Sequence, residues 1–169
     1  MSEAKTDMPM PAPPGTEHKR LEPFAGKFRA EVKMWMGPGD PMVSTGVMIN
    51  TMDLDGRFLR HEYKGDPNPG PFPNFEGRGF WGYNDVAGKY EGVWVDNASN
   101  VMQVDTGGVD ASGKVWTMEG AMTCPQTGKP LTKRSVITLR DNDHHTMEMF
   151  FVRDGQDSKG MEINYERMS

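Results

Sequence analysis

Aromatic rings and glycines are concentrated between residues 75 and 96, a combination typical of the wall of a binding pocket. The segment holds six aromatic residues, among them Trp81, Tyr83 and Trp94, together with five glycines. A glycine inside a strand marks the close approach of another group, which is either a ligand or a large side chain from a neighbouring strand. A solid core, in which small residues pack against large aromatic ones, has the same composition. The segment therefore leaves a pocket and a packed core as alternatives.

Asp96 is the charged member of this group, because a two-residue period turns it to the same side as Trp94. A carboxylate that faces an interior needs a charged or hydrogen-bonding partner. His61 or Arg167 could supply it, the latter from the same strand face as Tyr165. If Asp96 instead lies in water at a strand end, it needs no partner.

We therefore predict a ligand-binding site with aromatic walls and polar anchors. The walls are Trp81, Tyr83, Trp94 and Tyr165, and the anchors are His61, Asp96 and Arg167. Such a site would take a small hydrophobic or amphipathic molecule. One alternative is an enzyme that uses Asp96 with His61 or with a second carboxylate, either Glu119 or Glu148. Another is a homo-oligomeric module that buries an exposed apolar sheet face made of Phe58, Met147, Met149 and Phe151.

The sequence gives little support for metal binding, dinucleotide binding or a cysteine nucleophile. His144 and His145 are adjacent, so in a strand they point to opposite faces and do not converge on a metal ion. The GRGFWG stretch at 77–82 fits a dinucleotide-binding pattern, but it lies in a predicted strand with no helix after it. Cys124 precedes a proline in a turn and has no histidine at a suggestive spacing. We predict no metal site and no cofactor, and we assign no catalytic residue.

Ten strands must position these side chains. Alternating apolar and polar residues predict strands at 27–36, 43–53, 57–64, 75–83, 89–96, 101–107, 114–122, 131–140, 145–153 and 160–167. Short turn signals such as DLDG at 53–56 and DASGK at 110–114 separate them, which favours a meander of hairpins. A sheet of this size twists and would expose two edges, so we predict closure into an up-and-down antiparallel barrel, with a β-sandwich as the alternative.

The hairpin formed by 75–83 and 89–96 has a register that its loop must set. A four-residue loop is expected to place Trp81 opposite Tyr90 and Gly77 opposite Trp94, with Gly79 and Gly92 facing each other. Two facing glycines between aromatic rings would leave space. The barrel interior is then either a pocket or a core that these rings fill.

The chain start has a different composition. Residues 1–15 are rich in proline and are predicted to form a disordered tail, whereas residues 16–169 form one barrel domain. Thr16 can cap a short helix that carries Leu21 and Phe24 on one face, and Gly26 ends it.

Composition limits the partners. The net charge is −5 and no basic run is longer than two residues, so nucleic acid is not an expected partner. No stretch reaches the roughly 20 apolar residues of a membrane helix, and the start lacks the apolar run of a secretory signal. The single cysteine, Cys124, cannot form an internal disulfide, which suits the cytoplasm. Fifteen methionines are many for 169 residues, and methionine can line permissive apolar cavities.

Several blocks together resemble a known family. They are HKRLEPFAGKF at 18–28, GRFLRHEYKG at 56–65, FEGRGFWGYND at 75–85, VWVD at 93–96 and NYER at 164–167. In order and spacing these are similar to the bacterial domain-of-unknown-function family 1579, from His18 to Arg167. Phe28 stands where that family often has tryptophan, and Asn84 where it often has aspartate. The resemblance implies a calycin-like, lipocalin-type antiparallel barrel and implies no activity.

Overall fold

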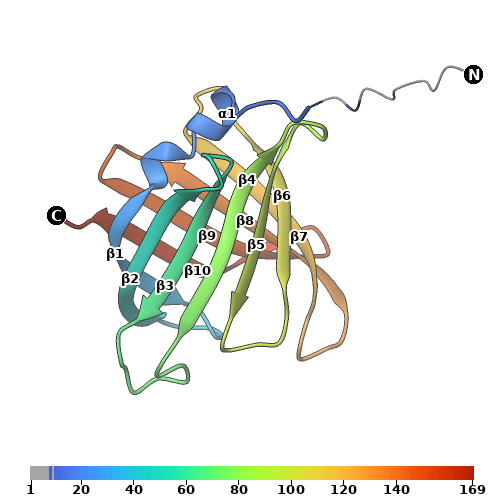
Figure 1. Ribbon diagram of the computed structural model, residues 1–169. Coiled ribbons are helices and arrows are strands. Elements are labelled where there is room, and N and C mark those ends of the chain that lie inside the picture. Colours follow the sequence, from blue (N-terminus) through green and yellow to red (C-terminus); the bar gives the residue numbers. More distant parts are fainter. Residues whose placement is uncertain (1–7, 9) are drawn as a thin grey trace, which may run out of the picture.

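Ten strands follow one another around a closed barrel in the computed structural model, which describes residue 8 and residues 10–169 (Figure 1). The strands are β1 (Gly26–Met34), β2 (Met42–Asp53), β3 (Phe58–Gly65), β4 (Glu76–Asn84), β5 (Lys89–Asp96), β6 (Gln103–Val109), β7 (Val115–Thr123), β8 (Pro130–Leu139), β9 (His144–Arg153) and β10 (Gln156–Arg167). Every strand pairs antiparallel with its neighbours in sequence, and β1 pairs with β10. The predicted up-and-down barrel is confirmed, and the β-sandwich alternative is wrong.

The N-terminal segment closes one end of this barrel. A four-residue helix, α1 (Thr16–Lys19), and a 3₁₀ turn, η1 (Glu22–Phe24), precede β1. Figure 1 shows α1 at one end and the loop between β3 and β4 at the opposite end. The helix is capped by Gly15 and not by Thr16 as expected, and His18 Nδ1 accepts a hydrogen bond from the Gly15 N–H at 3.1 Å. Of the predicted tail, residues 1–7 and 9 lie outside the described residues, and residues 8 and 10–15 form no helix or strand.

The core lies in two clusters along the barrel axis. At the end covered by α1, Phe24 packs against Trp81 and Trp116 with ring centroids 5.3 and 5.2 Å apart, and Tyr90 joins them. A second cluster lies along the inner faces of β1, β2, β3 and β10; its members are Phe28, Ala30, Val32, Met48, Tyr63, Ile163 and Tyr165. Aromatic rings bury large areas and prefer such edge-to-face contacts. The covered end of the barrel is therefore tightly filled.

The register of the β4–β5 hairpin differs from the expectation by two residues. The loop has the expected four residues between Asn84 and Lys89, but Trp81 lies opposite Gly92 and Gly79 opposite Trp94. Because side chains alternate with a period of two, a shift of two leaves every residue on its predicted face. A Cβ added to Gly77 would overlap the Trp94 indole. Gly77 and Gly79 thus make room for Trp94 and do not form an empty space with it.

Two histidines lie in the barrel wall with their rings turned inward. His145 on β9 stacks on Tyr165 with ring centroids 4.4 Å apart, and it contacts the edges of Phe24 and Phe28. Burial, followed by the charges of His61 and Arg167, lowers the pKa of His145 to about 3. His61 on β3 pairs its Nδ1 with Asn50 Oδ1 at 2.8 Å, and burial lowers its pKa to about 4. Both rings are neutral at pH 7.

Adjacent glycines on β6 give a sharp test of the packing. A Cβ on Gly107, which faces Met118 inside the barrel, would overlap the Thr117 backbone, whereas a Cβ on Gly108 meets nothing within 4 Å. We expect Gly107→Ala to lower the free energy of unfolding by about 1–3 kcal/mol, as overpacking does, and Gly108→Ala to change it little. Urea unfolding of both variants checks this. Equal midpoints for the two would contradict the placement of β6 against β7.

The buried histidines predict acid sensitivity. Since the folded pKa of His145 lies below its unfolded value near 6.5, the unfolded chain binds more protons, and stability falls as pH drops from 6.5 toward 3. We expect His145→Phe to reduce the loss between pH 6.5 and 4.5 by about 1.4 kcal/mol per pH unit. Urea midpoints at several pH values measure the slope. His144→Gln, on the exposed outer side, is the control and should not reduce it; an unchanged slope in His145→Phe would refute the buried neutral ring.

Candidate functional site

The barrel half farther from α1 is filled less completely than the covered half. Exposure alternates along β6, where inward Gln103 and Asp105 are half-buried and Val104 and Thr106 are exposed. Trp94 on β5 also points inward, opposite Gly79, and is half-buried, whereas Trp81 and Trp116 at the covered end are buried. These inward side chains keep part of their area exposed, whereas Leu131, Lys133 and Ser135 of the same half are buried. We call the inward surface of this half the open half.

A buried ion pair is the main polar feature of the open half. Lys133 on β8 faces inward, and its Nζ lies 2.8 Å from Asp105 Oδ2 and 3.0 Å from Gln103 Oε1. The Lys133 and Asp105 side chains are 10% and 18% exposed. A buried charge is tolerated when it is paired and hydrogen-bonded. Gly120, opposite Lys133 on β7, gives the pair room, because a Cβ there would overlap the Asp105 carboxylate.

Methionines form the apolar side of the open half. Met42, Met34, Met161 and Met149 are directly opposite one another across β2, β1, β10 and β9. Their faces are inward, since Met34 continues the face of buried Val32 and Met161 that of buried Ile163. Methionine is flexible and polarizable, so a row of this kind adapts to irregular apolar shapes. Such a row can accommodate apolar ligands of different shapes.

Trp94 and Asp96 lie together near the open mouth. The Trp94 Nε1–H donates to Asp96 Oδ2 at 3.0 Å, and the Ala98 N–H donates to Asp96 Oδ1 at 3.0 Å. The loop of residues 66–75 is held beside them, because Asn97 Nδ2 donates to the Asn74 carbonyl at 2.7 Å. A hollow of about 190 Å³ separates this loop from residues 97 and 98. Asp96 therefore orients the Trp94 indole at the mouth.

The structure separates the predicted wall residues. Trp81 is buried among Phe24, Tyr90 and Trp116, and Tyr83 packs against Tyr90 with centroids 5.0 Å apart, so both belong to the covered end. Tyr165 is buried in the second cluster against His145. Among the four predicted wall residues, Trp94 is the one that lines the open half.

The predicted ion pairs of Asp96 are wrong. Arg167, at the other end of the barrel, donates to the carbonyls of Pro23, Ala25 and Asn142 at 2.8–2.9 Å. His61 is bonded to Asn50. The expectation failed because sharing a face does not place two residues at the same height in the barrel. Asp96 finds its partners in Trp94 and Ala98.

The other sequence-based sites are also rearranged. Met147, Met149 and Phe151 face inward, opposite Ile137, Ser135 and Lys133, whereas Phe58 lies outside against Gly82, so the predicted shared oligomerisation face does not exist. Glu119 and Glu148 point outward, opposite Arg134 and beside Lys159, and cannot act with inward Asp96.

Sequence reasoning missed Asp105, Lys133 and Gln103. A signal was present in QVDTGGV at 103–109, where a two-residue period puts Gln103 and Asp105 on the face of Gly107 and leaves Val104 on the other. The polar residues face in and Val104, 58% exposed, faces out. Polar residues are ordinarily assigned to the solvent face, which hides this inverted pattern.

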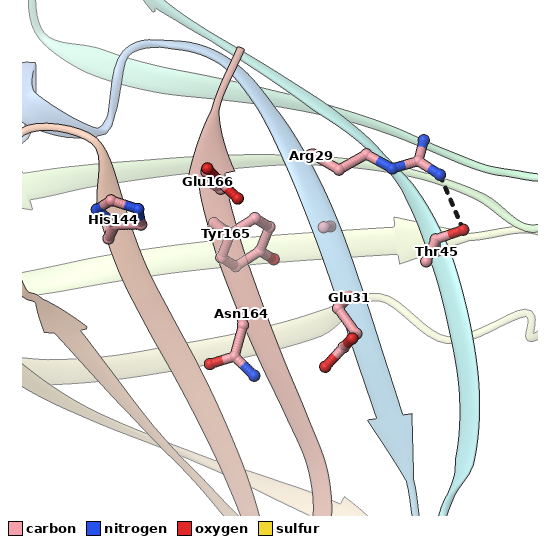
Figure 2. A pocket seen from close by; sticks show the side chains of 8 residues that line it. Arg29, Glu31, Thr45, His144, Asn164, Tyr165 and Glu166 are labelled. Carbon is pink, nitrogen blue, oxygen red and sulfur yellow. Dashed lines mark hydrogen bonds between the residues drawn. The ribbon is translucent and has the colours of Figure 1, made fainter.

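A second hollow lies on the outer surface and is polar. It measures about 420 Å³ and is lined mainly by charged and amide side chains of β1, β2, β9 and β10 (Figure 2). Arg29 donates to Thr45 Oγ1 at 3.0 Å and pairs with Asp66. Glu31, His144, Asn164 and Glu166 also line it, together with Ala30 and Tyr165, so charged and polar groups outnumber the apolar walls usual for small-molecule sites.

Residue 8 and residues 10–169 contain no group of three or more His, Cys, Asp or Glu side chains arranged to hold a metal ion. Over the same residues, no helix combines the length and apolar composition needed to cross a membrane.

Known structures share this fold. The protein Rv2717c from M. tuberculosis is 14% identical with a TM-score of 0.64, and the match covers 92% of this chain and 99% of that one. An S-type phycobiliprotein lyase, CPES, from Guillardia theta is 10% identical with a TM-score of 0.60, over 92% and 99% of the two chains. At such low identity the likeness concerns the fold alone. No curated protein matches the chain.

A family model agrees with the resemblance found in the sequence blocks. The model described as "Protein of unknown function (DUF1579)" matches residues 13–167, which is nearly the whole chain and all ten strands. The chain therefore belongs to the DUF1579 family.

Proposed function

We propose that this protein binds a small hydrophobic or amphipathic molecule in the open half of its barrel. The observation that carries the proposal is the inward pair of Lys133 and Asp105, which lies in the same half of the barrel as Trp94, Phe151 and the methionine row. Pockets of this composition, mostly apolar with a few polar groups, are typical of small-molecule sites. Small barrels of eight to ten strands are also near the size at which the interior holds one small ligand.

The residues divide into a supporting half and a binding half. We assign a supporting role to five predicted residues. Trp81 and Tyr83 pack at the covered end, Tyr165 in the second cluster, and His61 and Arg167 are held by hydrogen bonds to Asn50 and to backbone carbonyls. Trp94 and Asp96 remain in the proposed site, and Lys133, Asp105 and Gln103 join them. A barrel of similar fold that is named a phycobiliprotein lyase is compatible with ligand binding here, as an analogy of fold.

Self-association is a second candidate, favoured by an apolar row on the outside of β4, β5 and β6. Phe80 lies opposite Val93, and Val93 opposite Val104, with Phe80 40% and Val104 58% exposed. Light scattering at high concentration tests it, and a pure monomer removes it. For location we propose the cytoplasm, on the evidence of the single cysteine.

The position of the site predicts which tryptophan reports binding. We expect medium-chain alcohols, esters or aromatic compounds to change the tryptophan emission of the wild type, because a ligand in the open half replaces water against Trp94. Trp94→Phe should lose most of this change. Trp35→Phe is the matched control, since Trp35 lies under Lys159 on the outer surface and should leave the response intact.

Calorimetry with the same compounds distinguishes binding that leaves the tryptophan emission unchanged from no binding at all. If no compound binds by calorimetry, the proposed function is wrong. If binding is measured but Trp94→Phe responds like the wild type, the ligand lies elsewhere.

A further inference from the structure

Lys133 has a hydrogen-bond donor that the described side chains leave unused. A lysine ammonium carries three N–H groups. Among the described residues, Asp105 and Gln103 take two of them, at 2.8 and 3.0 Å. The side chain is nine-tenths buried, and it faces the open half. Water or an acceptor atom of a ligand can take the third N–H.

The surroundings of Lys133 form a built site. Asp105 balances the charge of Lys133, and Gln103 accepts a second hydrogen bond from its Nζ. Gly120 has no side chain, which leaves space for the Asp105 carboxylate. Ser135, the next inward residue on β8, is buried beside it, opposite Met149. Apolar and polar surface thus meet at one point, as an amphipathic ligand requires.

The local charges select the kind of acceptor. Lys133 is already neutralised by Asp105, and Asp96 is the other inward carboxylate toward the mouth. Arg153 is exposed and its Nη2 donates to Cys124 Sγ at 3.2 Å, so it is not part of the buried pair. A carboxylate ligand would place a second anion beside Asp105, which is unfavourable. A neutral oxygen accepts the free N–H without this repulsion.

We infer, on the basis of the proposed function, that the ligand carries a neutral oxygen acceptor, such as an alcohol, ketone, aldehyde or ester. This oxygen accepts a hydrogen bond from Lys133 Nζ, and the apolar body of the ligand lies along Trp94 and the methionine row. Free carboxylic acids are poor ligands because Asp105 occupies the position that their charge would take.

Matched ligands of one chain length test the inference. Decan-1-ol and methyl decanoate offer a neutral oxygen, whereas decanoate at pH 7.5 offers a carboxylate. We expect wild-type protein to bind the neutral pair about tenfold more tightly than decanoate in calorimetry. Asp105→Asn keeps the shape and removes the negative charge, so it should raise the affinity for decanoate about tenfold and abolish or reverse the preference.

Two further variants complete the design. Asp157→Asn is the charge control, because Asp157 pairs with Arg134 on the outside of the barrel and should leave both affinities unchanged. The double variant Lys133→Met with Asp105→Asn removes the anchor without leaving an unpaired buried charge, and it should bind the neutral ligands no better than decane. Thermal unfolding and circular dichroism confirm that each variant is folded.

The outcomes separate the two proposals. If no ligand binds to the wild type or to any folded variant, the proposed function fails and this inference with it. If all three ligands bind equally and Asp105→Asn changes nothing, the barrel binds apolar molecules without the Lys133 anchor, and only this inference is overturned. Tighter binding of decanoate than of decan-1-ol by the wild type also overturns it.

Discussion

The pairing of β1 with β10 is the constraint on which the rest of the structure depends. It closes the sheet, so that the inward residues of all ten strands share a single interior and no strand edge is left open. The chain ends reinforce this closure. Arg167 donates to the carbonyls of Pro23 and Ala25, and its guanidinium lies 4.6 Å from the Phe28 ring centroid. The end of the chain is thereby fastened to the segment that leads into the first strand.

The proposed ligand binding depends on how the shared interior is filled. Phe24, Trp81, Tyr90 and Trp116 form a continuous set of aromatic contacts under the N-terminal segment. A second buried cluster of the same size lies along β1, β2, β3 and β10, and Trp94 and Met161 pack against it. The other end can then hold methionines, a half-buried tryptophan and an ion pair, which would make a poor core. Two buried clusters form the apolar core, and the proposed binding surface adjoins the second of them.

The strands were predicted well because each depends on local alternation. The expected ranges differ from the observed strands by a few residues at their ends, and even the hairpin register, wrong by two, kept Trp81 and Trp94 on the inner side. The site was predicted less well. Trp94 lies in the open half, but the Asp96–Arg167 pair was wrong, and Lys133 and Asp105 were not recognised. Each failure concerns strands that are distant in sequence.

The sequence by itself determined the number of strands, their turns and the face on which each side chain lies, because these follow from residue type and a period of two. Only the tertiary structure decided which inward residues meet. In a closed barrel the strands are staggered and tilted, so the height of a residue depends on the register of every pairing between it and its partner. Lys133 reaches Asp105 across β7, and Arg167 and Asp96 lie at opposite ends, although both face inward.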